Sequence, residues 1–355
     1  MANNDPEIKL FTVQELRSWL IHNQHIEGLS STIISTSRAY AFINNPYVEN
    51  NDPVIAAVYI RDPQKGLKPI AYTAAFPDMI QGEKKWWFST LWCHSNYRGK
   101  GYPLVAVGSL AEEYREGNYL DMWGAPETVE IFNYLGLKRS YFTEFHFGPK
   151  LQQKNWKSKA AFQLYRIKNL IPYSKLNRTF ANYDYSLEYT QFISDETYSF
   201  IQRNSSDYIL TRTQAMLNWI LTYPFMRSMP STKRVHHNNI FSDKVENYWL
   251  SGVTVKKGEQ IIGFYILRVR QTELSVKYLY YDGAYQNEVF NSIMEHIINQ
   301  NVTNFSTRNP VLADYTSRLN IFNKRNEIDI SFSHPQQLNA EDGKMIQGGD
   351  GDSFV

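Results

Sequence analysis

The sequence predicts an α/β (α+β) fold built from two tandem units, each a mixed, mainly antiparallel sheet flanked by helices. Two observations support this fold class. A chain of 355 residues is longer than a usual single domain, and each half is long enough to bury its own core. Within each half, an apolar β-hairpin is followed by a further strand, a short loop and a patterned helix.

The N-terminal unit contains a regular succession of elements. Thr12 can cap a first helix, because apolar residues follow it at helical spacing. Two β-branched and aromatic runs joined by a charged turn predict an antiparallel hairpin, and a Trp-rich run predicts the next strand. The expected elements are a helix at 13–21, a loop at 44–52, strands at 54–60, 70–76 and 86–93, a helix after residue 101, a strand at 119–123 and a helix at 126–135.

A basic glycine loop, Arg98-Gly99-Lys100-Gly101, separates the strand at 86–93 from the following helix. Glycine lets the backbone approach a ligand closely, and Arg98 and Lys100 add positive charge beside it. The helix that begins here directs free N–H groups and a partial positive charge at the loop. A nucleotide P-loop would need a Lys-Ser/Thr pair after its last glycine, and a dinucleotide fold would need a third glycine. We therefore expect a diphosphate site of another kind.

The loop resembles the coenzyme A loop of the GNAT N-acetyltransferase superfamily, which has the pattern Arg/Gln-x-x-Gly-x-Gly/Ala. Arg98 and Gly101 match this pattern, whereas Pro103 stands where the family has Gly or Ala. Proline suits the first turn of a helix but removes one N–H donor from the pyrophosphate cradle. The resemblance implies acetyl-CoA as co-substrate, no metal, and a cofactor site formed by Arg98, Gly99, Lys100, Gly101, Tyr102 and Pro103 together with the backbone of Leu91, Trp92 and Cys93.

A second motif of the family, Tyr-x-x-x-Gly-Phe, is matched only in part, by Phe132, Gly136 and Leu137. The tyrosine of that motif often protonates the leaving thiolate of coenzyme A, and phenylalanine has no proton to give. Tyr134 lies two positions away and would face another side of its helix. The resemblance therefore does not identify the acid of the reaction.

Acyl transfer to an amine also needs a base, or a water path, that deprotonates the ammonium group. The candidates are Glu83, His94, Asp121 and Glu127, of which we take His94 and Glu83 as catalytic residues. His94 ends the strand before the glycine loop, and histidine often acts as a base near neutral pH. Cys93 is the only cysteine, and its place in an apolar strand favours packing over nucleophilic catalysis.

The predicted organisation has four parts. The second unit lacks a specific motif, and its loop at 282–287 has no basic residue and begins with Asp282, which disfavours a diphosphate. The parts are 1–150, an N-terminal GNAT-like acetyl-CoA-binding domain; 151–178, a connector rich in Lys and Arg; 179–335, a degenerate GNAT-like domain; and 336–355, a C-terminal tail.

The net charge and the distribution of apolar residues indicate the location and the partners of the protein. The net charge is only +2, and no apolar run approaches the length that spans a bilayer. The first residues lack the basic-then-apolar pattern of a signal peptide. We therefore expect a cytoplasmic protein with a small-molecule amine as its partner, no membrane span and no nucleic-acid partner, while the oligomeric state is not predicted.

The predicted function is that of an acetyl-CoA-dependent N-acetyltransferase acting on an amine acceptor. A looser resemblance to tandem GNAT proteins of polysaccharide synthesis suggests a nucleotide-linked amino sugar as the acceptor. Two alternatives stay open. Pro103 and Phe132 would suit a catalytically inactive GNAT-fold binding protein, and the basic connector would suit an aminoacyl transferase that uses charged tRNA.

Overall fold

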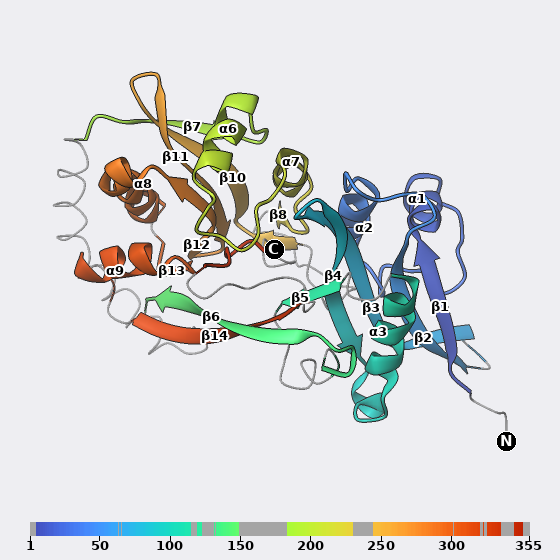
Figure 1. Ribbon diagram of the computed structural model, residues 1–355. Coiled ribbons are helices and arrows are strands. Elements are labelled where there is room, and N and C mark those ends of the chain that lie inside the picture. Colours follow the sequence, from blue (N-terminus) through green and yellow to red (C-terminus); the bar gives the residue numbers. More distant parts are fainter. Residues whose placement is uncertain are drawn as a thin grey trace.

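Twelve strands of the described chain form one continuous sheet that runs through both halves of the molecule (Figure 1). The strand order across this sheet is β1-β2-β3-β4-β5-β14-β6-β13-β12-β11-β10-β7. A separate pair of short parallel strands joins β8 (Arg227–Met229) to β9 (Lys244–Glu246). The computed structural model describes residues 5–62, 64, 66–114, 119–122, 131, 133–148, 183–229, 244–300, 302–319, 322, 325–334 and 344–350.

The first half of the sheet is an antiparallel arrangement of four strands. The hairpin expected from the sequence is formed by β2 and β3, and β4 and β1 complete the group. Helix α1 begins where predicted, because Thr12 and Glu15 form a capping box. The bounds are β1 (Glu7–Thr12), α1 (Val13–Ile21), α2 (Thr36–Ile43), β2 (Pro53–Asp62), β3 (Gly66–Ile80), β4 (Glu83–Cys93) and α3 (Tyr102–Glu113).

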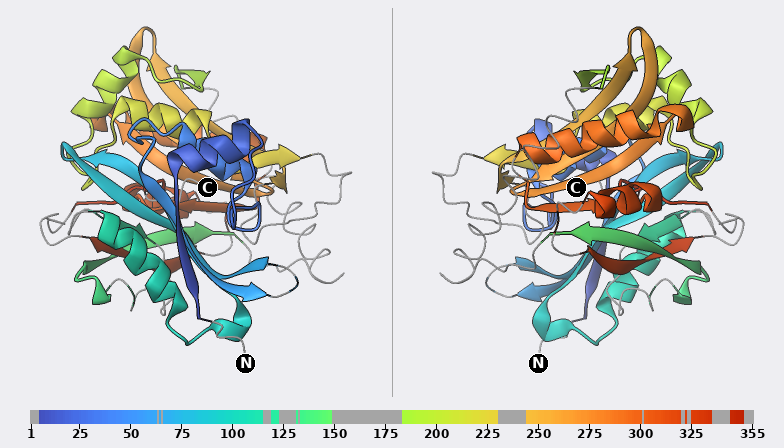
Figure 2. Two further views of the ribbon diagram at one scale, coloured as in Figure 1. Left: turned by 90° about the vertical axis from the view of Figure 1, so that its right-hand side faces the viewer. Right: turned by 90° about the vertical axis from the view of Figure 1, so that its left-hand side faces the viewer.

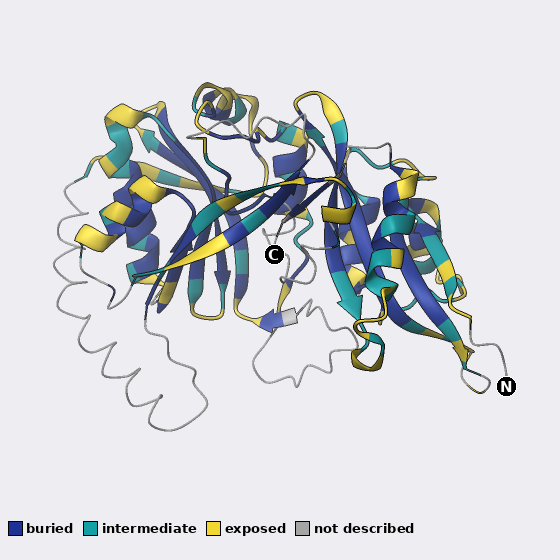
Figure 3. Ribbon diagram, turned by 60° about the horizontal axis from the view of Figure 1, so that its bottom comes forward, coloured by how far each residue is buried: buried dark blue, intermediate teal, exposed yellow. Residues whose placement is uncertain are grey.

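Helices cover both faces of these strands (Figure 2). On one face, Phe76 of β3 packs against Phe42 of α2 and against Trp219 of α7 (Gln214–Thr222). On the other face, Trp86 of β4 stacks on Tyr114, which directly follows α3, with 4.0 Å between the ring centroids. The strands are therefore buried from both sides, as the colouring in Figure 3 shows.

The second half repeats this order of elements. Strands β10 and β11 form an antiparallel hairpin, β12 and β7 flank it, and α8 follows β12 after a short turn, as α3 follows β4. The sequence predicts helices at 196–202, 213–221 and 289–298 and strands at 248–254, 261–269 and 274–282, and each has its counterpart in the structure. The bounds are β7 (Ser186–Thr190), α6 (Asp195–Arg203), β10 (Tyr248–Lys257), β11 (Gln260–Arg270), β12 (Glu273–Tyr281), α8 (Gln286–Asn299) and α9 (Pro310–Arg318).

The middle of the sheet is built from strands that lie far apart in the sequence. Strands β5 (Tyr119–Met122) and β6 (Lys138–Phe147) come early in the chain, whereas β13 (Asn304–Thr307) and β14 (Arg325–His334) come late. In space, β14 lies between β5 and β6, and β6 lies between β14 and β13 (Figure 1). This interleaving joins the two halves by backbone hydrogen bonds.

Part of the expected organisation lies outside the described residues. This is the case for the connector at 151–178 and for most of the helix expected at 126–135, Phe132 included. The boundaries at 150, 178 and 335 stay predictions. Among the described residues, no helix combines the length and the apolar character needed to cross a membrane.

A buried ion cluster centred on Arg212 connects the two halves. The guanidinium pairs with Asp78 of β3 and, at 3.1 Å, with Asp350, and all three side chains are at most 1% exposed. Asp78 also accepts a hydrogen bond of 3.2 Å from the indole N–H of Trp87 in β4. The cluster thereby holds together β3, the loop before α7 and residues 344–350.

The Arg212 cluster allows a direct test of stability. Arg212→Leu leaves two carboxylates buried without their cation, so the free energy of unfolding should fall by about 3–5 kcal/mol. Arg61→Leu is the matched control, because Arg61 is 62% exposed and pairs only at the surface, with Glu7 and Glu27, where a loss of about 0–1 kcal/mol is expected. Urea titration of both variants measures the difference, and equal losses would contradict the assignment.

A second buried titratable group lies in the second half. His296 of α8 is 4% exposed, and its Nε2 lies 3.2 Å from the hydroxyl of Tyr265, which is itself 3.0 Å from the hydroxyl of Ser292. Burial lowers the pKa of His296 from its ordinary value to about 4. The folded protein therefore keeps this imidazole neutral where an unfolded chain would take up a proton.

Acidification should consequently destabilise the fold through His296. Between pH 6.5 and pH 4 the unfolded chain binds the extra proton, so the free energy of unfolding falls as pH decreases, by up to about 1.4 kcal/mol per pH unit. His296→Gln should flatten this dependence, whereas His25→Gln, at an exposed position, should leave it unchanged. Urea titrations at pH 7, 6, 5 and 4 provide the measurement, and identical slopes for the parent and His296→Gln would refute the prediction.

Candidate functional site

The candidate site lies where β4 parts from β5. These parallel strands pair at Trp86 and Trp87, and beyond that point no pairing joins the described parts of the two strands. Strand β5 instead turns to β14, pairing through Asp121 and Met122. Strand β4 continues along β3 with an irregularity at Thr90, whose φ of 55° is unusual for a β-branched residue.

Beyond Trp87, no described residue forms a backbone pair with β4 on the side of β5. The N–H of His94 donates to the carbonyl of Ile70 in β3, at 2.8 Å. Because successive residues of a strand direct their N–H groups to opposite sides, those of Cys93 and Leu91 are directed away from β3. Leu91 and Cys93 thus direct backbone donors to the side where the resemblance implies a carbonyl oxygen, whereas the N–H of Trp92, between them, is directed toward β3.

The glycine loop follows directly and has the backbone conformation that its sequence suggests. His94 caps a 3₁₀ turn, η1 (Ser95–Tyr97), after which Gly99 and Gly101 have φ values of 74° and 78°. Both values lie in the left-handed region that favours glycine. A Cβ atom at either position would have no other atom within 4 Å, so the space beside the loop is open.

Helix α3 starts on this open side. Gly101 is its N-cap and makes no side-chain cap, so the first amides of the helix lack intrahelical partners. Pro103 occupies the second helical position and removes one of these donors, while the N–H groups of Tyr102 and Leu104 remain. The N-terminus of α3 therefore offers both donors and dipole charge to an anion.

The positive side chains of the loop lie at the surface. Arg98 and Lys100 are both exposed, and Arg98 Nε donates to the carbonyl of Cys93 at 3.5 Å. Lys100 Nζ lies 5.3 Å from the ring centroid of Tyr97. Arg98, Gly99, Lys100, Gly101, Tyr102 and Pro103 thus share one surface loop, as the sequence pattern predicts.

His94 is half-buried, and its ring is held by the loop itself. Its Nδ1 accepts a hydrogen bond of 3.3 Å from the backbone N–H of Asn96, so a neutral ring carries its proton on Nε2. In this tautomer Nε2 donates a hydrogen bond and has no lone pair that could accept a proton. The sequence contains no signal for this orientation, because it depends on the 3₁₀ turn.

Glu83 lies at the opposite end of β4 from His94. An extended strand of this length separates its ends by about 30 Å, so the structure does not bring these two candidates together. The Glu83 carboxylate accepts a hydrogen bond from Lys85 Nζ at 2.6 Å, and this bond lowers its pKa. Glu83 lines a different surface hollow with Trp86 and Tyr114.

Cys93 is placed beside the loop, yet its thiol is poorly suited to nucleophilic attack. Burial raises the pKa of Cys93, and nearby Arg98 offsets this only in part. The thiol contacts the carbonyl of His94 at 3.6 Å. At neutral pH the thiolate, which is the reactive form, is therefore scarce.

The reactivity of this single thiol provides a prediction. In the folded protein, Ellman's reagent should modify Cys93 slowly at pH 7.5, and the rate should keep rising beyond pH 9 because the thiolate population keeps growing. Protein unfolded in urea is the control and should react faster at each pH. A rate that reaches its plateau below pH 8 would show an activated thiol instead.

The described residues contain no group of three or more His, Cys, Asp or Glu side chains arranged to hold a metal ion. Phe132, at the position of the family's usual acid, lies outside the described residues. The functional feature that sequence reasoning missed is the irregularity at Thr90, since strand propensities alone would continue β4 without interruption.

Comparison with known proteins supports the fold. No protein-family model matches this sequence, and no curated protein matches it. A solved structure of a putative acetyltransferase from Pyrococcus horikoshii is 8% identical, with a TM-score of 0.53 over 98% of this chain and 95% of that one. Further matches are a GCN5-related N-acetyltransferase from Kribbella flavida (11% identical, TM-score 0.49, 92% and 70% covered) and a tandem GNAT protein from the clavulanic acid biosynthesis pathway (10% identical, TM-score 0.47, 93% and 98% covered).

The likeness to the Pyrococcus protein extends over nearly the whole of both chains. Together with the order of elements repeated in the two halves, it shows that the chain has a tandem GNAT-like fold. At this level of identity the likeness concerns the fold alone, and function has to be argued from the site.

Proposed function

We propose that the protein is an acetyl-CoA-dependent N-acetyltransferase whose first unit carries the active site. One observation supports this most strongly: Gly99 and Gly101 both have positive φ, have open space beside them, and stand at the N-terminus of α3 next to Arg98 and Lys100. Diphosphate of coenzyme A matches this combination of amide donors, dipole and positive charge. The described residues therefore fit the co-substrate.

The parted strands suggest where the acyl group would lie. In the proposed reaction the amine nitrogen attacks the thioester carbonyl carbon, a C–N bond forms, the C–S bond breaks, and coenzyme A leaves as its thiolate. Negative charge develops on the carbonyl oxygen during attack. The N–H groups of Leu91 and Cys93, directed away from β3, are the donors that we assign to this oxygen.

Proton transfer is the part of the reaction in which this chain departs from the family pattern. The amine loses one proton and the thiolate gains one. His94 is our candidate for proton transfer: with Nδ1 occupied, its Nε2–H can donate a hydrogen bond to the departing thiolate. It would release a proton only as the imidazolium, in which Nδ1 gives up the hydrogen bond from Asn96. Glu83 is hydrogen-bonded to Lys85 at the far end of β4. It could act as a base only for an amine that binds in the surface hollow lined by Glu83, Trp86 and Tyr114.

The acceptor in this proposal is a small-molecule amine, with a nucleotide-linked amino sugar as the class suggested by the resemblance. The cytoplasmic setting is likewise a prediction from the sequence. An inactive binding protein and a tRNA-dependent aminoacyl transferase are the alternatives that the experiment below separates from it.

Calorimetric titration with acetyl-CoA tests the proposal. We expect one site per chain, because the second unit has neither the glycines nor the positive charge of the first loop. Gly101→Val should abolish binding, since valine disfavours a φ of 78° and its methyl groups would enter the open space. Gly283→Val is the matched control in the second unit, where a Cβ atom has no other atom within 4 Å, and it should bind like the parent.

Each contrary result has its own meaning. Two sites per chain would assign a coenzyme site to the second unit as well, whereas no binding by the parent would favour the tRNA-dependent alternative. Binding without release of free thiol in the presence of a panel of nucleotide-linked amino sugars would favour the inactive binding protein. Parent-like binding by folded Gly101→Val would remove the first loop from the site.

A further inference from the structure

The second unit contains a counterpart of the parted strand. Asp282 caps a 3₁₀ turn, η2 (Gly283–Tyr285), by accepting the N–H of Ala284, just as His94 caps η1. The N–H of Asp282 donates to Ile262 in the neighbouring strand, as that of His94 donates to Ile70. His94 and Asp282 are therefore equivalent positions.

Strands β4 and β12 also correspond at the positions before these two residues. Three residues before each cap lie Leu91 in β4 and Leu279 in β12, and both N–H groups are directed away from the hairpin strand. Strand β12 also parts from its parallel partner, because β13 pairs with it only as far as Ser275. An irregularity at Lys277 interrupts β12 much as that at Thr90 interrupts β4.

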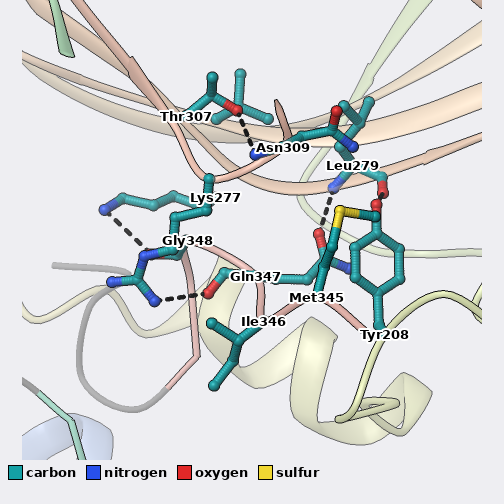
Figure 4. Close-up of a pocket in the computed structure, with 11 residues that line it drawn as sticks. Tyr208, Lys277, Leu279, Thr307, Asn309, Met345, Ile346, Gln347 and Gly348 are labelled. Atoms are coloured by element: carbon teal, nitrogen blue, oxygen red, sulfur yellow. Dashed lines mark hydrogen bonds between the residues drawn. The ribbon is translucent and has the colours of Figure 1, made fainter. Parts of the chain in front are cut away.

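In the second unit, however, residues 344–350 occupy the space beside the parted strand (Figure 4). The side-chain carbonyl of Gln347 accepts the N–H of Leu279 at 2.8 Å, and the N–H of Gly349 donates to the carbonyl of Lys277 at 2.7 Å. An amide carbonyl oxygen thus fills the position whose counterpart at Leu91 we assign to the acyl oxygen.

The fit of the segment is close. Its N-terminal part pairs with the loop before α7, since Met345 exchanges backbone hydrogen bonds with Asp207 and Ile209 at 2.8 and 2.9 Å. A Cβ atom on Gly349 would lie 2.2 Å from the ring of Tyr278, and one on Gly348 would lie 2.7 Å from the carbonyl of Val276. Only glycine fits at positions 348 and 349.

Two buried basic side chains hold the backbone of the segment from the other side. Arg308 donates to the carbonyl of Gln347 at 3.0 Å, and Lys277 Nζ donates to that of Gly348 at 3.4 Å. Both side chains are at most 6% exposed. Asp350 ends the described segment in the Arg212 cluster, and its second oxygen accepts the N–H of Gln347 at 2.8 Å.

We propose that the groove beside β12 is a binding site for an extended peptide, and that its occupant is residues 344–350 of the same chain. Arg308 and Lys277 of the groove bind backbone carbonyls of the peptide. The N–H of Leu279 binds a Gln side chain. The ring of Tyr278 lies so close to the peptide that only a Gly-Gly pair fits beside it. While the segment is bound, the second unit cannot admit a thioester. The exclusion of a thioester rests on the function proposed for the first unit, whereas the peptide site itself rests on the contacts of residues 344–350.

The experiment displaces the segment in the full chain with Gly349→Val. Gly283→Ala is the control, because a side chain there meets open space. Hydrogen exchange should report at least a tenfold faster rate for the Leu279 amide in Gly349→Val, with the amides in the middle of the β10–β11 hairpin unchanged. A fluorescently labelled synthetic peptide with the sequence of residues 344–350 should bind Gly349→Val and should not bind the parent or Gly283→Ala.

The inference would be overturned if folded Gly349→Val kept the parent exchange rate at Leu279, if it opened the groove but failed to bind the peptide, or if the parent bound the peptide equally well. A peptide in which Gln and both Gly residues are replaced by Ala should not bind. Should Gly349→Val not fold, Gln347→Leu takes its place, since it removes only the acceptor of the Leu279 N–H. Faster exchange confined to that amide supports the inference, and unchanged exchange overturns it.

Discussion

The buried guanidinium of Arg212 constrains the whole arrangement. It lies between the carboxylates of Asp78 and Asp350, which are 272 positions apart in the sequence (350 − 78), and none of the three has access to water that could replace a lost partner. Because an unpaired buried charge is costly, β3, the loop before α7 and residues 344–350 have to come together in one way. Trp87, which donates to Asp78, is also the last residue of β4 that pairs with β5. The cluster therefore lies at the point where the strands part.

In both halves, two parallel strands pair at one end and separate at the other: β4 and β5 in the first half, β12 and β13 in the second. In the first unit this separation leaves donors of β4 beside an open, positively charged glycine loop. In the second unit it creates a groove that the chain fills with its own residues. The two units differ in a few residues of the loop that follows the parted strand. The loop of the first unit has Arg98, Lys100 and two glycines. The loop of the second unit has Asp282, and its 3₁₀ turn leads directly into α8. On our proposals, the same arrangement of strands forms a ligand site in the first unit and a docking site for the chain's own residues in the second.

Elements with a strong local signal could be predicted from the sequence. The hairpins β2–β3 and β10–β11 have long β-branched and aromatic runs separated by polar turns, and α1 has the capping residues Thr12 and Glu15. Helices α2 and α9 and strands β1, β6, β7, β8, β9, β13 and β14 were not predicted. In β14, Ile328, Ile330 and Phe332 alternate with polar residues, so the sequence carried a strand signal that was not used. Strand β6 places Tyr141 and Phe142 in succession and lacks a regular alternation. Their pairing comes from partners distant in the sequence.

The sequence by itself determined the backbone conformation of the first loop. A Gly-x-Gly turn with two basic residues, after an apolar strand and before an amphipathic helix, needs positive φ at its glycines and faces a helix N-terminus, and both features are present. Only the tertiary structure decided that β4 leaves β5 beyond Trp87, that His94 uses Nδ1 to cap a turn, that Glu83 lies at the far end of the strand, and that residues 344–350 fill the second groove. These depend on hydrogen bonds and ion pairs between residues far apart in the chain, and no local pattern of side chains encodes such contacts.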